Sequence, residues 1–217
     1  MDQEKSLPVL SAPQIRVLGA LIEKSKTTPD YYPLTINALT AACNQRTSRN
    51  PVTDYSEDTV RSALGELKAM SLVATAVGGG SRTLKYKHNF NTVYDTSEAE
   101  LALLCLLFLR GPQTPGELNT NSARLYDFKS LEQVITTLEK LCETTPAFVK
   151  EMPKRAGQKE TRFMHLLGDL PLIEDDTASA SPRSHLPADD LNERVTALEQ
   201  ELQMVKADLA RIMKDLF

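Results

Sequence analysis

The chain has 217 residues, which is enough for one large domain or two small ones with a substantial core. Its 25 Lys and Arg residues against 29 Asp and Glu give a net charge of −4, so a uniformly basic coat for nucleic acid is excluded. No apolar run approaches the ~18 residues of a membrane span, and the three cysteines without C-x-x-C spacing indicate reduced thiols. We therefore expect a cytoplasmic protein with no membrane partner.

Residues 1–93 are predicted to form a first domain, because a helical periodicity recurs three times before it changes to that of strands. The first helix begins after Ser11 and ends before the prolines of TTPDYYP, the second covers about 34–44, and the third follows Ser56. LVATAV and TLKYKH then flank a glycine-rich turn as the two strands of a hairpin. Three helices followed by a hairpin is the order of a winged-helix domain.

Residues 94–168 repeat this order and are predicted to form a second domain. Capping boxes at Ser97, Thr114 and Ser130 open three helices, and AFVKEM and ETRFMHL flank PKRAGQK as a second hairpin. The repeat is one of pattern, since no residue-level similarity between the halves is visible. The predicted fold class is mainly α with small β-hairpins (α+β), with two tandem winged-helix domains followed by a C-terminal coiled-coil helix.

The end of the chain is predicted to join copies of the protein. Residues 169–187 are acidic and rich in Ser, Pro and Ala, which predicts a flexible acidic linker, and residues 188–217 carry an unbroken heptad seam. Opposite charges that flank the seam, such as Arg194 and Glu199, favour a parallel homodimer. Leucine at the a positions of the heptad, with β-branched residues at two of the d positions, favours higher oligomeric states instead. Packing of this helix onto its own domains stays open. The seam consists of Leu191, Val195, Leu198, Leu202, Val205, Leu209, Ile212 and Leu216.

A basic surface is expected on the first domain, which holds eleven basic and eight acidic side chains, whereas residues 94–168 and 169–217 have balances of −1 and −6. In winged-helix proteins that bind DNA, the third helix enters the major groove and the wing contacts phosphates. Glu57 and Asp58 open the third helix here, so we expect phosphate contacts and no sequence-specific reading of bases. The candidate phosphate-binding residues are Arg46, Arg49, Arg61, Arg82, Lys85 and Lys87.

No catalytic or metal-binding constellation is visible in the sequence. His88 and His165 each end the second hairpin strand of their domain, where packing or capping is their expected role. No two cysteines lie within four residues of each other, as a metal site would need, and no histidine lies beside them in the sequence. Cys43 lies near Arg46, the cationic neighbour that a reactive thiol needs, but a small apolar residue on a helix face is the better prediction. We predict a non-enzymatic protein without a cofactor or a metal.

Two long stretches carry a resemblance to a known family. RVLGALIEKSKTTPDYYPLTINALTAACNQRTSRNPV, and later LALLCLLFLRGPQTPGEL and RFMHLL, resemble the YceH-like family of bacterial proteins over residues 11–168. The resemblance implies a tandem winged-helix fold, a bacterial cytoplasm and self-association, and it implies no activity. Of its two matched loops, we expect the prolines and Tyr32 to be structural. Asn44 and Gln45 are candidates for an interaction loop, together with Arg46 and Arg49.

Two functions remain open for this sequence. The first is association with double-stranded DNA, in a role related to transcription, through phosphate contacts of the first domain. The alternative is a scaffold, in which the winged helices and the coiled coil dock protein partners, because one fold serves both functions. The acidic third helices favour the scaffold and the basic wing favours DNA, which we rank slightly ahead.

Overall fold

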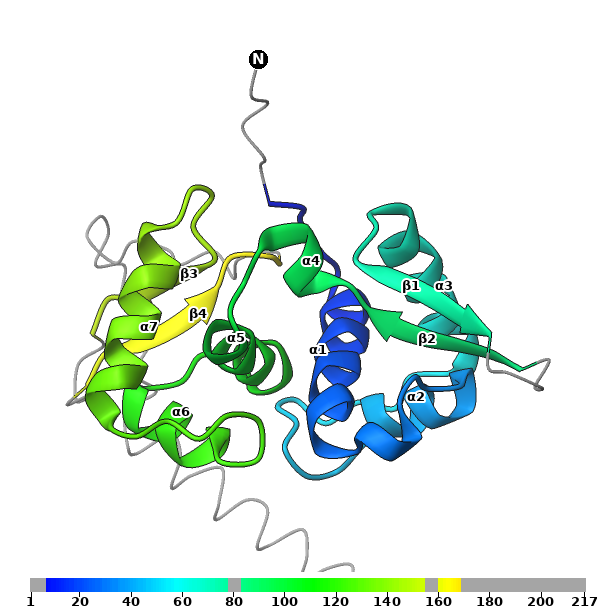
Figure 1. Cartoon of the computed structure of the whole chain (residues 1–217), viewed down its shortest axis with the longest axis horizontal. Coiled ribbons are helices and arrows are strands. Elements are labelled where there is room, and N and C mark those ends of the chain that lie inside the picture. Colours follow the sequence, from blue (N-terminus) through cyan, green and yellow to red (C-terminus); the bar gives the residue numbers. More distant parts are fainter. Residues whose placement is uncertain (1–6, 78–82, 155–159, 169–217) are drawn as a thin grey trace, which may run out of the picture. The chain divides into compact units, whose positions relative to one another are not determined.

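Helices and two small antiparallel hairpins make up the described part of the computed structural model, which comprises residues 7–77, 83–154 and 160–168 (Figure 1). The mixed α and β class expected from the sequence is therefore confirmed. All of these residues belong to one compact unit. The predicted linker at 169–187 and the predicted coiled-coil helix at 188–217 lie outside the described residues.

The first half of this unit, residues 7–88, ends in a hairpin whose strands pair in register from Val73 opposite His88. Leu34, between the first two α-helices, bridges Tyr86 through two backbone hydrogen bonds of 3.1 and 2.8 Å. The second helix therefore begins later than predicted, because Leu34 is part of this bridge and Thr35 caps the helix. The elements are α1 (Ala12–Thr27), the 3-10 helix η1 (Pro29–Tyr31), α2 (Ile36–Cys43), α3 (Glu57–Ala69), β1 (Val73–Val77) and β2 (Leu84–His88).

A short helix that the sequence analysis did not predict, α4 (Phe90–Tyr94), leads to the second half, residues 98–168. Phe90 is 0% exposed and anchors this helix against Phe108 and Phe148, with ring centroids 6.0 Å away in each case. The second half repeats the architecture of the first, and here Gln113 bridges Phe163. Its elements are α5 (Glu98–Arg110), α6 (Pro115–Ser122), α7 (Leu131–Glu143), β3 (Val149–Met152) and β4 (Arg162–His165).

The helix starts follow from their capping residues. The predicted N-caps are confirmed at Ser11, Ser56, Ser97, Thr114 and Ser130. Ser97 and Thr114 also form the predicted capping boxes. Ser130 accepts a hydrogen bond from the Gln133 amide, but the Gln133 side chain accepts from the Lys129 amide instead of closing a box. The third predicted capping box is therefore wrong in its second bond.

The two halves repeat one local arrangement in detail. In each half a Pro-x-Thr sequence precedes the second helix, its middle residue bridges the second hairpin strand, and a histidine ends that strand two residues after the bridge. The sequence alone did not show this repeat because the shared residues are few and widely spaced. The matching sets are Pro33, Leu34, Thr35, Tyr86 and His88 in the first half, and Pro112, Gln113, Thr114, Phe163 and His165 in the second.

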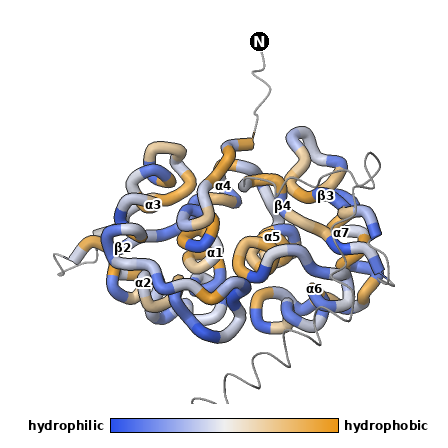
Figure 2. The backbone as a smooth tube through the Cα atoms, turned by 180° about the vertical axis from the view of Figure 1, so that it is seen from behind, coloured by the Kyte–Doolittle hydropathy of each residue, from blue (hydrophilic) through white to orange (hydrophobic). Residues whose placement is uncertain are grey.

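The helices α1 and α5 lie side by side at the centre of the unit, so the two halves share one hydrophobic core (Figure 1). Gly19 permits this close approach, because a Cβ atom there would lie 2.9 Å from Leu109 Cδ2 and 3.1 Å from Phe108 Cβ. Most of α5 is hydrophobic (Figure 2), which fits its burial among α1, α6, α7 and β4. The domain boundary between residues 93 and 94 stays a prediction.

The two strand-ending histidines are expected to make the protein less stable in mild acid. Burial lowers the pKa of His88 and of His165 to about 4, and the charge of Lys26 adds to the effect at His88. The unfolded chain takes up these protons near pH 6.5, so stability is full above that pH and falls as the pH drops towards 4. We expect a loss of about 1 kcal/mol per histidine by pH 5.5, measured by urea unfolding at a series of pH values.

The double variant His88→Gln/His165→Gln is the comparison for this pH series. It should have a flatter dependence of unfolding free energy on pH between 6.5 and 5.5, because the groups that titrate there are gone. An unchanged pH dependence in this variant would assign the acid sensitivity to other groups.

Candidate functional site

The loop between α2 and α3, residues 44–56, is held in place by two buried arginines. The first is Arg16 of α1, which is 4% exposed. Its guanidinium donates to the carbonyl of Cys43 at 3.2 Å and to that of Pro51 at 2.6 Å. These bonds satisfy backbone acceptors that no regular element pairs, so the long loop follows a defined path over the end of α2.

Arg49 is the second, and its place in the interior differs from the exposed position that phosphate contact requires. Its side chain is 0% exposed and forms a two-pronged pair with Glu23 of α1, at 2.7 Å between Nη2 and Oε2 and 3.2 Å between Nη1 and Oε1. Its remaining N–H groups donate to the Ala42 and Ser48 carbonyls and to Gln45 Oε1. All of its donors thus have partners inside the protein.

Glu23 stays ionised in this position. Burial by itself would raise the pKa of Glu23, but the hydrogen bonds and charge of Arg49 outweigh burial and lower that pKa. Lys24, whose Nζ atom lies 3.1 Å from Glu23 Oε2, acts in the same direction. The loop is therefore attached to α1 by an ion pair between Arg49 and Glu23.

Asn44 and Gln45, the candidate interaction loop, also have partners within the protein. Asn44 Oδ1 accepts from the Tyr55 amide and Asn44 Nδ2 donates to the Tyr55 carbonyl, both at 2.8 Å, so this side chain closes the loop on itself. Gln45 Oε1 accepts from Lys24 Nζ at 3.2 Å and from Arg49 Nη2 at 3.1 Å. Asn44 has a structural role, whereas Gln45 reaches a cleft.

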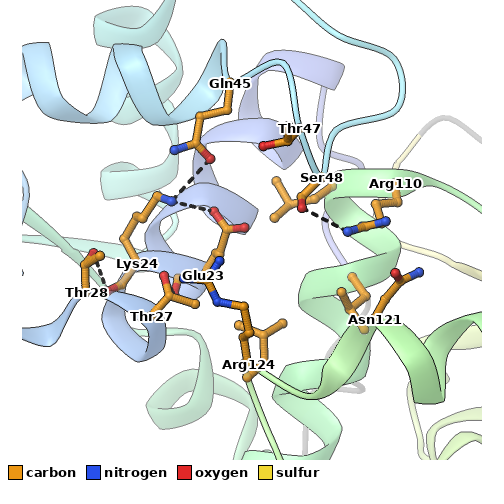
Figure 3. A pocket seen from close by; sticks show the side chains of 13 residues that line it. Glu23, Lys24, Thr27, Thr28, Gln45, Thr47, Ser48, Arg110, Asn121 and Arg124 are labelled. Carbon is orange, nitrogen blue, oxygen red and sulfur yellow. Dashed lines mark hydrogen bonds and ion pairs between the residues drawn. The ribbon is translucent and has the colours of Figure 1, made fainter.

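This cleft, which we call the central cleft, opens where the loop meets the second half of the unit (Figure 3). Its volume is about 280 Å³. Glu23 and Lys24 lie on one side, Arg110 and Asn121 lie opposite them, and Arg124 comes from the segment after α6 (Figure 3). Hydroxyl groups and Gln45 add to a mainly polar lining, which contains Thr27, Thr28, Thr47 and Ser48.

Two hydrogen bonds connect the loop to the far side of the central cleft. Arg110 Nη2 donates to Ser48 Oγ at 2.9 Å, and the Asn50 amide donates to the Leu109 carbonyl at 2.9 Å. Both partners lie at the C-terminal end of α5. The loop therefore contacts α1 and α5 at once, and the cleft is made by both halves of the unit.

The remaining candidate phosphate-binding residues lie at the surface of the first half. Arg46 and Lys87 are exposed and Lys85 is half-buried, and none of the three has an ion-pair partner in the described part of the chain. Arg61 is exposed too, but it is paired with Glu57 one turn earlier on α3. Arg82 and the heptad residues lie outside the described residues.

The buried thiol near this loop is protonated at neutral pH. Burial raises the pKa of Cys43 to about 12, and the charges of Arg49 and Arg16 offset that effect only in part.

Over residues 7–77, 83–154 and 160–168, no three His, Cys, Asp or Glu side chains come together as a metal site. In the same ranges no helix has both the length and the apolar character that crossing a membrane requires.

Of the residues that build the central cleft, Gln45 was a candidate from the sequence, whereas the charged residues were not. One signal was available on the first helix, where Arg16, Ala20 and Glu23 share a face by their helical spacing. Charged residues on a face that also carries alanine indicate buried pairing. Arg110 and Arg124 gave no comparable signal, because their place depends on the packing of α1 against α5.

Fold and site together define a mainly helical protein with two similar halves, each ending in a hairpin, and a polar cleft between them. The chain belongs to the family described as "Protein of unknown function, DUF480", whose model matches residues 10–158. The name YceH-like, given above from the resemblance, stays a prediction.

Three relatives show how far the similarity extends. The chain is 44% identical over 210 residues to the UPF0502 protein of Shewanella loihica, a match that covers 94% of this chain and 98% of the relative. It is 44% identical over 211 residues to the UPF0502 protein of Cellvibrio japonicus, with 95% of each chain covered. With the UPF0502 protein of Solibacter usitatus the identity is 43% over 198 residues, covering 91% of this chain and 93% of the relative. The similarity to these bacterial proteins thus includes nearly the whole chain.

Proposed function

We propose that this is a non-enzymatic, DNA-associated protein built from two tandem winged-helix domains, whose first half contacts DNA phosphates. The element order supports the winged-helix assignment. Each half has a helix, a residue that bridges the hairpin, two further helices and then the hairpin itself. Since one fold serves several functions, the choice of DNA rests on the surface of the first half.

The observation that carries the proposal is a set of three cations, Arg46, Lys85 and Lys87, that have no acidic partner among the described residues. Tyr86 is 8% exposed, so the alternation of β2 directs the two flanking lysines to the opposite face of the hairpin. Arg46 is exposed in the loop that precedes α3. Cations that are free of carboxylates release counterions when they neutralise phosphates, and this release supplies most of the sequence-independent affinity for DNA.

The charges on the exposed face of α3 favour contact with the DNA backbone and disfavour recognition of base edges in the major groove. It carries Glu57, Asp58 and Glu66 against Arg61 and Lys68. Arg61 is already paired with Glu57. Because phosphates surround the major groove, a helix with surplus acid is repelled from it. Arg49 has no part in the proposed contact, since its donors are used inside the protein.

We further propose that two copies associate through residues 188–217, where the heptad seam in the sequence predicts a parallel homodimer. A dimer presents two basic surfaces to one duplex, so the second contact gains from a high effective concentration. Light scattering of the full chain gives the mass of the assembly and therefore the number of copies.

Fluorescence anisotropy of the full chain with a mixed-sequence duplex, titrated across salt concentrations, tests the DNA proposal. The logarithm of the affinity should fall with the logarithm of the salt concentration, with a slope of about −0.9 for each phosphate neutralised. The variant Arg46→Ala/Lys85→Ala/Lys87→Ala should bind more weakly. Its slope should be smaller by about 2–3 in each subunit, because three cations are gone.

A matched control removes the same charge from exposed positions of the second half, in the variant Lys129→Ala/Lys150→Ala/Lys154→Ala. This control should keep the slope of the unaltered protein. Equal losses in the two triple variants would show that net charge governs binding and not the proposed surface. The DNA proposal ends if no duplex binds even at low salt.

A protein-interaction scaffold is the second candidate, and one feature of the second half favours it. A groove of about 530 Å³, lined by α7 and the β3–β4 hairpin, contains the apolar side chains of Ile135 and Phe163 and the carboxylates of Glu139 and Glu151. A partner segment with apolar and basic side chains is complementary to this lining. The anisotropy experiment separates the candidates, because such a scaffold needs no salt-dependent affinity for a duplex.

A further inference from the structure

The central cleft has no role in the proposed DNA contact, yet it collects positive charge from both halves. Lys24 comes from α1, Arg110 from α5, and Arg124 from the segment after α6. Glu23, the one carboxylate among the described lining residues, is paired with Lys24 and with the buried Arg49 behind it, so it does not balance Arg110 or Arg124. The described groups of the cleft therefore leave a surplus of positive charge without a balancing carboxylate.

Arg110 and Arg124 are the least satisfied of these cations. Neither has an ion-pair partner among the residues that the structure describes. Arg110 Nη2 binds Ser48, but Arg110 Nε is buried and has no hydrogen-bond partner there. A buried guanidinium N–H without an acceptor is costly, so it indicates a place for an acceptor that the chain itself does not supply.

Two hydroxyl groups complete the set of donors. Ser48 Oγ accepts the bond from Arg110 and keeps its own hydrogen for another partner. Thr47 also lines the cleft, and its side chain has no hydrogen-bond partner in the described part of the chain. Guanidinium and ammonium groups next to hydroxyls are the donors that recognise phosphate oxygens, because charge-assisted bonds to phosphate are the strong ones.

We propose that the central cleft binds a small phosphate-bearing ligand, held by Lys24, Arg110 and Arg124. The volume of about 280 Å³ lies just below the range of drug-sized ligand pockets, which begins at about 300 Å³, and it fits a phosphate with a few attached atoms. The phosphate of a nucleic-acid strand has the same chemistry. The small volume favours the free ligand, and the experiment separates the two sources.

Isothermal titration calorimetry of the full chain with inorganic phosphate and with pyrophosphate, at low ionic strength, tests this proposal. Both probes should bind, and pyrophosphate should bind more tightly because it carries more charge. The variants Arg110→Gln and Arg124→Gln should each weaken the affinity about tenfold, the effect of losing one charge-assisted hydrogen bond. Lys129→Gln should leave the affinity unchanged, because Lys129 pairs with Asp127 outside the cleft.

A competing explanation for Lys24 and Arg110 is that basic residues in the last turn of a helix stabilise the helix itself. In that case Arg110→Gln would lower the melting temperature and leave phosphate affinity as it was, which would overturn the proposal. Equal weakening by Lys129→Gln would also overturn it, because general charge attraction would then suffice. If a mixed-sequence duplex displaces pyrophosphate, the site belongs to a nucleic-acid backbone and the small-ligand assignment is wrong.

Discussion

Replacing Arg49 with alanine is expected to lower the free energy of unfolding by about 3–5 kcal/mol, the usual effect of removing one partner of a buried ion pair. The Arg49 side chain is 0% exposed and that of Glu23 is 12% exposed. Without the guanidinium, Glu23 remains nearly buried and keeps Lys24 as its one ion-pair partner among the described residues, and the Ala42 carbonyl loses the two donors of Arg49. Urea unfolding followed by circular dichroism measures the change.

Arg46→Ala is the matched control for this experiment. Arg46 lies in the same loop, carries the same charge and is exposed, so its loss should change the unfolding free energy by no more than about 0.5 kcal/mol. The double variant Arg49→Ala/Glu23→Gln should be destabilised by less than the sum of the single effects, because the unpaired carboxylate is gone. Similar small losses for Arg49→Ala and Arg46→Ala would show that the loop does not depend on the buried pair.

Arg46 and Arg49 also show where inference from the sequence stops. Both occur in one polar loop after a helix, so local pattern gives them the same expected exposure and the same candidate role. The structure separates them because α1 places Glu23 beneath one of them and not the other. Glu23 lies 26 residues earlier in the chain, and only the tertiary packing of α1 against α2 and its loop reveals the pair.

Features that depend on one turn of chain were predicted well, and those that depend on distant partners were not. The N-caps at Ser56 and Ser97 require only the next few residues, and both are confirmed. The start of α2 was placed too early because Leu34 is drawn into a bridge with Tyr86 of the hairpin. The central cleft was not predicted for the same physical reason, since it exists only where α1 and α5 meet.

Replacing Gly19, where α1 packs against α5, with valine is expected to lower the free energy of unfolding by about 3 kcal/mol. The new Cβ would lie within 2.9–3.1 Å of atoms in Leu109 and Phe108, and the two γ carbons of valine would add to the clash. Overpacking of a filled core costs about 1–3 kcal/mol, and a branched side chain between two helices belongs at the upper end. Urea unfolding again measures the change.

Gly65 of α3 provides the matched control, because no atom of the described residues lies within 4 Å of a Cβ built there. Gly65→Ala should raise the free energy of unfolding by about 0.5–1 kcal/mol, since alanine favours the helix and meets no neighbour. Gly19→Ala makes the same chemical change but should destabilise, because even one methyl group separates α1 from Phe108 Cβ. Opposite signs for the two alanine variants would show that the two halves are held together by this close helix contact. Two stabilising changes would show instead that α5 can move away from α1 without loss, and that the cleft between the halves is not fixed by their packing.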